Sequence, residues 1–209
     1  MTDRFLKAKH WQIFLLTFGI PFLVQMVVMI NVMSEVFSNP QAPPADIVEH
    51  LRFMPIVMFV FTAIFYGWIW SVATGLQSKL PAGVTMKVNR FKVFFFIPMV
   101  YLLLIILAIS IFLGDLATME TEPDPAKILT LVLTLLPFHF FAIFCLLYIQ
   151  YFAAKTIKTI EYQREVSFGD FIGEFFLIWF YPIGIWFLQP KINTFVTNNA
   201  SSDVLTPEI

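Results

Sequence analysis

The stretch 93-VFFFIPMVYLLLIILAISIFL-113 decides the fold class of this chain, because it is long, apolar and free of charged residues. A membrane-spanning helix needs about 20 mostly apolar residues to cross about 30 Å of hydrocarbon. Three further stretches meet the same requirement, at 11–36, 53–76 and 128–154. We therefore predict an all-α membrane protein whose four transmembrane helices form a four-helix bundle.

The composition of the 209 residues supports this class. Hydrophobic residues make up 59% and charged residues 13%, whereas a soluble domain carries about 25% charged residues. No basic stripe is present that would hold nucleic acid, so we expect no nucleic-acid partner. The single cysteine, Cys145, excludes a disulfide within one chain. The first apolar stretch is too long for a signal peptide and lacks a cleavage pattern, so we read it as a retained span.

The distribution of basic residues predicts the orientation, because Lys and Arg gather in cytoplasmic loops. Only Arg52 and Lys127 fall in the two loops that we assign to the outside, and Lys191 is undecided. The other ten precede the first span or lie in the segments after the second and fourth spans: Arg4, Lys7, Lys9, Lys79, Lys87, Arg90, Lys92, Lys155, Lys158 and Arg164. We expect the N-terminus inside, and the C-terminus inside as well.

The two halves of the chain are similar enough to suggest a duplicated hairpin. When Pro55 is placed over Pro137, Tyr66 falls on Tyr148 and Thr74 falls on Thr156. Each half would leave the cytoplasm and return to it, which gives parallel repeats related by an axis along the membrane normal. Chance matches of common residues are the alternative.

The apolar segment near the C-terminus, Phe171 to Leu188, leaves two interpretations open. Its length is close to the lower limit for a span, and Tyr181-Pro182-Ile183-Gly184 breaks it at the centre. We favour a broken helix over 168–196 that forms a re-entrant or interfacial hairpin, opened by a capping box at Ser167 and Asp170. A fifth complete span is the alternative. Residues 197–209 read as a flexible polar tail.

Two groups of residues inside the spans attract attention. Small residues four apart line one face of the second span and predict close helix packing, which we expect within the chain: Ala63, Gly67, Ser71 and Gly75. Polar residues within apolar spans are costly and count as candidate functional residues: Gln25, Asn31, Glu35, His139 and Gln150. The simpler interpretation is that Glu35 reaches the headgroups, Asn31 bonds a neighbouring helix and His139 bonds a backbone carbonyl.

Glu174 is the remaining candidate, at the start of the hairpin. A hairpin that dips into the membrane would bury this carboxylate, and a protonatable group there suits a proton-coupled carrier. The simpler expectation is a water-facing glutamate stabilised by the helix dipole. Nucleophile elbows, phosphate loops and zinc-ligand patterns are absent from the sequence, so we expect no catalytic residue, cofactor or metal.

The run 174-EFFLIWFYPIGIWFLQPKIN-193 resembles the C-terminal signature of a group of small bacterial inner-membrane proteins without an assigned activity. The likeness is strong from about Lys155 to Asn193. It implies a bacterial cytoplasmic membrane and supplies no catalytic residue.

These observations favour a non-enzymatic accessory or assembly subunit of a larger inner-membrane complex. Its expected partners are the lipid bilayer and another membrane protein or further copies of the chain. The first alternative is a small-solute or proton-coupled transporter or channel subunit, which requires Gln25, His139, Gln150 and Glu174 to meet in one cavity. A lipid-acting membrane enzyme is the second alternative.

Overall fold

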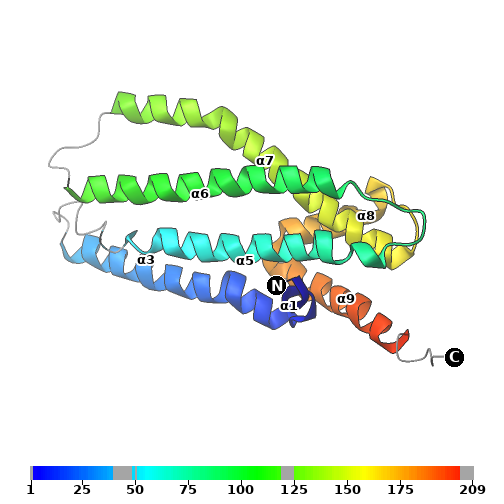
Figure 1. Cartoon of the computed structure of the whole chain (residues 1–209). Coiled ribbons are helices and arrows are strands. Elements are labelled where there is room, and N and C mark those ends of the chain that lie inside the picture. The colour runs from blue at the N-terminus through cyan, green and yellow to red at the C-terminus, as the bar shows by residue number, and fades with distance from the viewer. Residues whose placement is uncertain (1, 40–48, 50, 119–124, 203–209) are drawn as a thin grey trace.

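The computed structural model describes residues 2–39, 49, 51–118 and 125–202, and throughout these ranges the regular structure is helical. The elements follow the chain in this order: α1 (Thr2–Lys7), α2 (His10–Phe14), the π-helix η1 (Leu15–Gly19), α3 (Ile20–Ser38), α5 (Met54–Gly75), the 3₁₀ turn η2 (Gln77–Lys79), α6 (Val88–Thr118), α7 (Pro125–Tyr162), α8 (Phe168–Trp179) and α9 (Tyr181–Ser202). Figure 1 shows the long helices side by side, with both ends of the chain at one end of the molecule.

Four helices are long and apolar enough to cross a membrane: His10–Ser38, Met54–Lys79, Val88–Phe112 and Ile128–Tyr162. They coincide with the four predicted spans, so the predicted fold class is confirmed. The third helix begins at Val88 instead of Val93, and the fourth continues to Tyr162 instead of Ala154. At about 1.5 Å per residue, the 38 residues of α7 make it much longer than the hydrocarbon is thick.

The first span contains a π-helical turn, η1, ahead of Pro21. Proline has no N–H to donate to the carbonyl of Thr17, and its ring crowds that turn, so a wider turn relieves the contact. The hydroxyl of Thr17 donates a hydrogen bond of 2.7 Å to the carbonyl of Ile13, and the side chain is buried. The π-turn thus follows from a single residue of the sequence.

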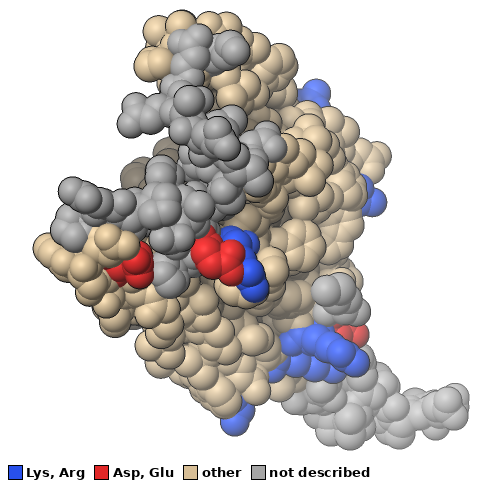
Figure 2. Space-filling model, turned by 90° about the vertical axis from the view of Figure 1, so that its left-hand side faces the viewer, with Lys and Arg blue, Asp and Glu red and all other residues tan. Residues whose placement is uncertain are grey.

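The two ends of the bundle differ in how tightly they pack. At the end that carries α1, η2, α8 and α9, which we call the closed end, large side chains such as Trp68, Phe91 and Phe171 are fully buried in one core. At the opposite end, the open end, α7 diverges from α6 (Figure 1). In the apolar stretch of each span, at most 33% of the residues are buried. In Figure 2, which looks onto the open end, most of the surface that is not grey belongs to uncharged residues, with a few separate charged side chains among them.

The C-terminal segment forms a helical hairpin at the closed end. α8 has 12 residues, about 18 Å of helix, which is too short to cross the hydrocarbon. The chain turns at Phe180, where φ is −90° and ψ is 51°, and α9 follows. The predicted break is therefore found one residue before Tyr181. α9 continues to Ser202, beyond Val196 where we expected the helix to end; residues 203–209 lie outside the described ranges.

The aligned prolines of the proposed duplication occupy different settings. Pro55 lies in the first turn of α5, whereas Pro137 lies in the interior of α7. Tyr66 is buried and Tyr148 is half-buried. The structure adds no support for a duplication at these positions.

Candidate functional site

Four charged side chains with alternating signs join α7, α8 and α9 at the closed end, and we call them the charge cluster: Lys158, Glu161, Glu174 and Lys191. Glu174 Oε1 accepts hydrogen bonds from Lys158 Nζ at 3.1 Å and from Lys191 Nζ at 3.0 Å. Glu161 carboxylate oxygens lie 3.0 Å from the same two ammonium groups. Each carboxylate is thus shared by two lysines, and the cluster as a whole carries no net charge.

The simpler expectation for Glu174, a water-facing side chain, is wrong. Its exposed fraction is 5%, because α9 folds back over α8 and brings Lys191 onto the carboxylate. A buried carboxylate without a partner is strongly destabilising, and two ammonium groups remove that problem. Through these two lysines, Glu174 on α8 contacts both α7 and α9 and so stabilises the hairpin.

Gln189 joins three elements in the same region. Its side chain is fully buried, and Oε1 accepts a hydrogen bond of 2.8 Å from Trp68 Nε1. Nε2 donates to the backbone carbonyls of Phe5 and Ala8, each at 2.9 Å. These carbonyls end α1, where no helical N–H reaches them. Gln189 therefore fastens the N-terminal segment to α5 and α9, and Asn193 Nδ2 adds a bond of 3.1 Å to the Ala8 carbonyl.

The turn between α8 and α9 depends on Gly184. A Cβ at this position would stand 1.7 Å from the backbone oxygen of Leu177, far inside any tolerated contact. The backbone of α9 thus passes directly over the last turn of α8. This close approach fixes the angle at which α9 returns and so positions Gln189 and Lys191.

The start of α8 is capped as the sequence predicts. The Asp170 carboxylate accepts hydrogen bonds from the Ser167 N–H at 2.8 Å and from the Ser167 hydroxyl at 2.9 Å. These bonds, together with the Arg164 guanidinium 3.2 Å away, hold the pKa of Asp170 below its usual value. The cap lets α8 begin immediately after the turn that follows α7.

The small-residue face of α5 packs against α1 of the same chain. A Cβ on Gly67 would meet the Phe5 ring at 2.9 Å, and one on Gly75 would meet Thr2 Cγ2 at 2.4 Å. Ser71 between them is buried and donates to the Gly67 carbonyl at 2.7 Å. Ala63, the outermost member, is exposed. The small residues admit a short N-terminal helix that sequence analysis did not anticipate.

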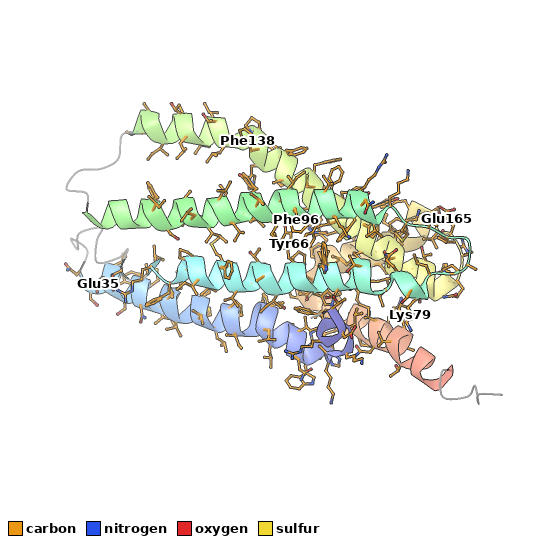
Figure 3. All side chains as sticks on the ribbon, viewed as in Figure 1. Glu35, Tyr66, Lys79, Phe96, Phe138 and Glu165 are labelled. Carbon is orange, nitrogen blue, oxygen red and sulfur yellow. The ribbon has the colours of Figure 1, made fainter. Side chains whose placement is uncertain are left out.

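The polar candidates of the first span lie along its contact with α5. Gln25 lines a cavity of about 260 Å³ with Met54 and Phe61. Asn31 lines a second one of about 520 Å³ with Glu49 and Phe53. Within the described residues Asn31 makes no side-chain hydrogen bond, so the expected bond to a neighbouring helix is not found. Glu35 is half-buried near the open end (Figure 3).

The polar candidates of α7 have different surroundings from each other. His139 is exposed, and its Nδ1 lies 3.1 Å from the Tyr101 hydroxyl on α6; the expectation of a backbone carbonyl partner is wrong. Gln150 is buried, and its Oε1 has no hydrogen-bond partner within the described part of the chain. Of Gln25, His139, Gln150 and Glu174, only Gln25 lines one of the cavities described above.

Sequence reasoning missed the two residues that complete this region, Glu161 and Gln189, and left Lys191 undecided. The available signal was the spacing of Gln189 and Asn193, four apart just after the apolar run that ends at Leu188, which places both on one face of the helix. Among the residues that the structure describes, no group of three or more His, Cys, Asp or Glu side chains could hold a metal ion. Comparison of the chain with family models, curated proteins and solved structures gives no match.

Proposed function

We propose that the chain is a non-enzymatic accessory or assembly subunit of a larger bacterial inner-membrane complex. The observation that carries the proposal is that two of the five polar candidates within the spans lie on the surface of the single chain. Asn31 and His139 are both exposed. Polar side chains within spans almost always face a bundle interior or a cavity, because hydrocarbon cannot satisfy them. In the single chain His139 contacts the Tyr101 hydroxyl, and Asn31 lines a cavity with Glu49. Partner helices at the open end would cover the parts of these two side chains that remain exposed.

The contacts at the closed end also support this proposal. Its polar residues are engaged in holding α1, α5, α7, α8 and α9 together, through the charge cluster and Gln189. A rigid closed end leaves the diverging helices of the open end as the surface on which a partner can pack. We place the closed end in the cytoplasm, because the segments with most of the basic residues lie there.

The transporter alternative receives less support from the geometry. A carrier built from a broken helix needs polar groups that converge on one site near the midplane, and of the four candidates only Gln25 lines a cavity described above. Glu174 is engaged by two lysines instead of facing a cavity. A lipid-acting enzyme would need a nucleophile with a base or a metal site, and among the described residues no group of three or more His, Cys, Asp or Glu side chains could hold a metal ion.

The test is purification of tagged chain in a mild detergent, with quantitative identification of co-eluting proteins. The double variant Asn31→Leu/His139→Phe removes the two exposed polar groups and should reduce the partner's yield at least several-fold. Leu23→Phe/Leu136→Phe, at exposed apolar positions of the same helices, is the matched control and should retain the partner. Equal recovery of the same proteins with both double variants would contradict the proposal.

A further inference from the structure

An apolar groove runs along the boundary between α5 and α6. Its volume is about 430 Å³. Tyr66 and Phe95 form its floor; both are buried, and their rings meet edge to face with centroids 5.2 Å apart. Phe59 and Phe96 stand at its rim, about half exposed. Figure 3 shows Tyr66 and Phe96 in the space between the two helices. We call this feature the α5–α6 groove.

The groove exists because small side chains stand where large ones would fill it. Ala63 and Gly67 line it from α5; a Cβ on Gly67 would meet the Phe5 ring of α1, so Ala63 is the position from which a larger side chain would fill the groove. The groove opens toward the lipid-facing surface through its exposed rim. Groove walls that no atoms contact lose dispersion energy. In a membrane, lipid hydrocarbon is the medium that surrounds the spans and can fill the groove to restore these contacts.

The dimensions favour a single extended hydrocarbon chain over a helix. The groove's lining residues on α5 run from Phe59 to Trp70, about 16 Å of helix at about 1.5 Å per residue. A helix is about 10 Å across with its side chains, whereas an extended hydrocarbon chain is narrow. A narrow, elongated occupant such as an acyl chain fits this shape.

A cation, Lys92, precedes the residues of α6 that line the groove, which begin at Phe95. Lys92 lies one helical turn before Phe96 on α6 and so shares its face. The side chain is exposed, and it forms no ion pair or hydrogen bond within the described residues. Long side chains on a helix point toward its N-terminus, which for Lys92 is toward the closed end and the headgroup region. An ammonium group there complements a phosphate.

We propose that the α5–α6 groove holds one acyl chain of an anionic phospholipid from the leaflet at the closed end, whose headgroup contacts Lys92. The inference is separate from the proposed function, because it concerns a lipid and uses a different part of the surface. An anionic lipid near a single lysine is favoured about fivefold, which corresponds to about 1 kcal/mol.

The test is native mass spectrometry of full-length chain reconstituted in nanodiscs of dioleoyl phosphatidylcholine and dioleoyl phosphatidylglycerol at a 3:1 ratio, then released into mild detergent. Wild type should retain one phospholipid, with phosphatidylglycerol enriched about fivefold over the bulk ratio. Ala63→Phe should lose the retained lipid, because its ring fills the groove from an exposed position. Leu103→Trp fills the groove from α6 and should have the same effect.

Two controls make the result specific. Ala108→Phe adds the same ring at an exposed position of α6 outside the groove and should retain the lipid. Lys92→Gln should retain one lipid without enrichment, whereas Arg90→Gln, two residues away on another face, should keep the enrichment. Unchanged retention in both groove-filling variants would overturn the proposal, as would unchanged enrichment in Lys92→Gln. If Ala63→Phe and Leu103→Trp lose a co-eluting protein and keep the lipid, the groove receives a protein side chain instead.

Discussion

Replacing Glu174 by glutamine should weaken the closed end measurably, although the two side chains have nearly the same shape. The change removes one of two negative charges in the charge cluster and leaves two lysines sharing Glu161. Breaking a buried ion pair by removing one partner costs about 3–5 kcal/mol, whereas an exposed pair contributes about 0–1 kcal/mol. Glu174 is buried, but Lys191 is 35% exposed and both lysines keep Glu161. We therefore expect a loss of about 1–3 kcal/mol.

The assay is thermal unfolding of purified protein in mild detergent, together with hydrogen exchange of α8 and α9. For a chain of this size, each kcal/mol corresponds to about 2–4 °C in Tm. Glu165→Gln is the matched control, because Glu165 pairs with Lys155 at 3.5 Å while 75% exposed. The double change Glu174→Gln/Lys191→Gln restores neutrality and should be less destabilising than the sum of its parts. Equal Tm for Glu174→Gln and Glu165→Gln would refute the structural role of the charge cluster.

Three further substitutions test the hairpin. Gly184→Ala should cost at least about 3 kcal/mol of unfolding free energy, because it forces a Cβ against the Leu177 backbone. Gly173→Ala, where an added Cβ meets nothing, is the control and should be neutral or stabilising. Equal Tm values for the two variants would disprove the close approach of α9 to α8. Gln189→Leu leaves the Phe5 carbonyl and the Trp68 indole N–H without Gln189, and leaves the Ala8 carbonyl with Asn193 alone. Proteolysis at α1 should therefore become faster, and unchanged protection would show that α1 is held by other contacts. Asp170→Asn weakens the cap of α8. Because the pKa of Asp170 is lowered in the fold, wild type should protect the α8 amides from hydrogen exchange better than the variant above pH 3.8, and the difference should disappear as the pH falls through the folded-state pKa. A difference in protection that is independent of pH would contradict this reasoning.

The membrane class and the four spans were predictable because length and hydropathy decide them almost alone. The stretch from Val93 to Leu113 has no other stable environment, and the structure extends it by five residues at each end, from Val88 to Thr118. The break before Tyr181 and the cap at Ser167 were predictable for the same kind of reason. Proline, glycine and a capping box act over a few neighbouring residues.

The contacts of Glu174 and Gln189 could not be predicted, because both depend on segments distant in sequence. Lys191 reaches Glu174 only after α9 reverses direction, and Gln189 bonds backbone carbonyls near residue 8. Short N-terminal helices such as α1 are marginal alone and form through tertiary packing. The glycines of α5 signalled a close partner but carried no information about which segment it would be.

The most direct test of the proposed function is photo-cross-linking in the native membrane with benzoylphenylalanine at Phe138. This residue lies on the diverging part of α7 and is 61% exposed (Figure 3). Phe187 of α9, 59% exposed near the closed end, is the matched position. The account predicts a discrete adduct with another membrane protein, or with a second copy of this chain, from Phe138 and not from Phe187. Adducts with lipid alone at Phe138, or a protein adduct from Phe187 alone, would contradict it.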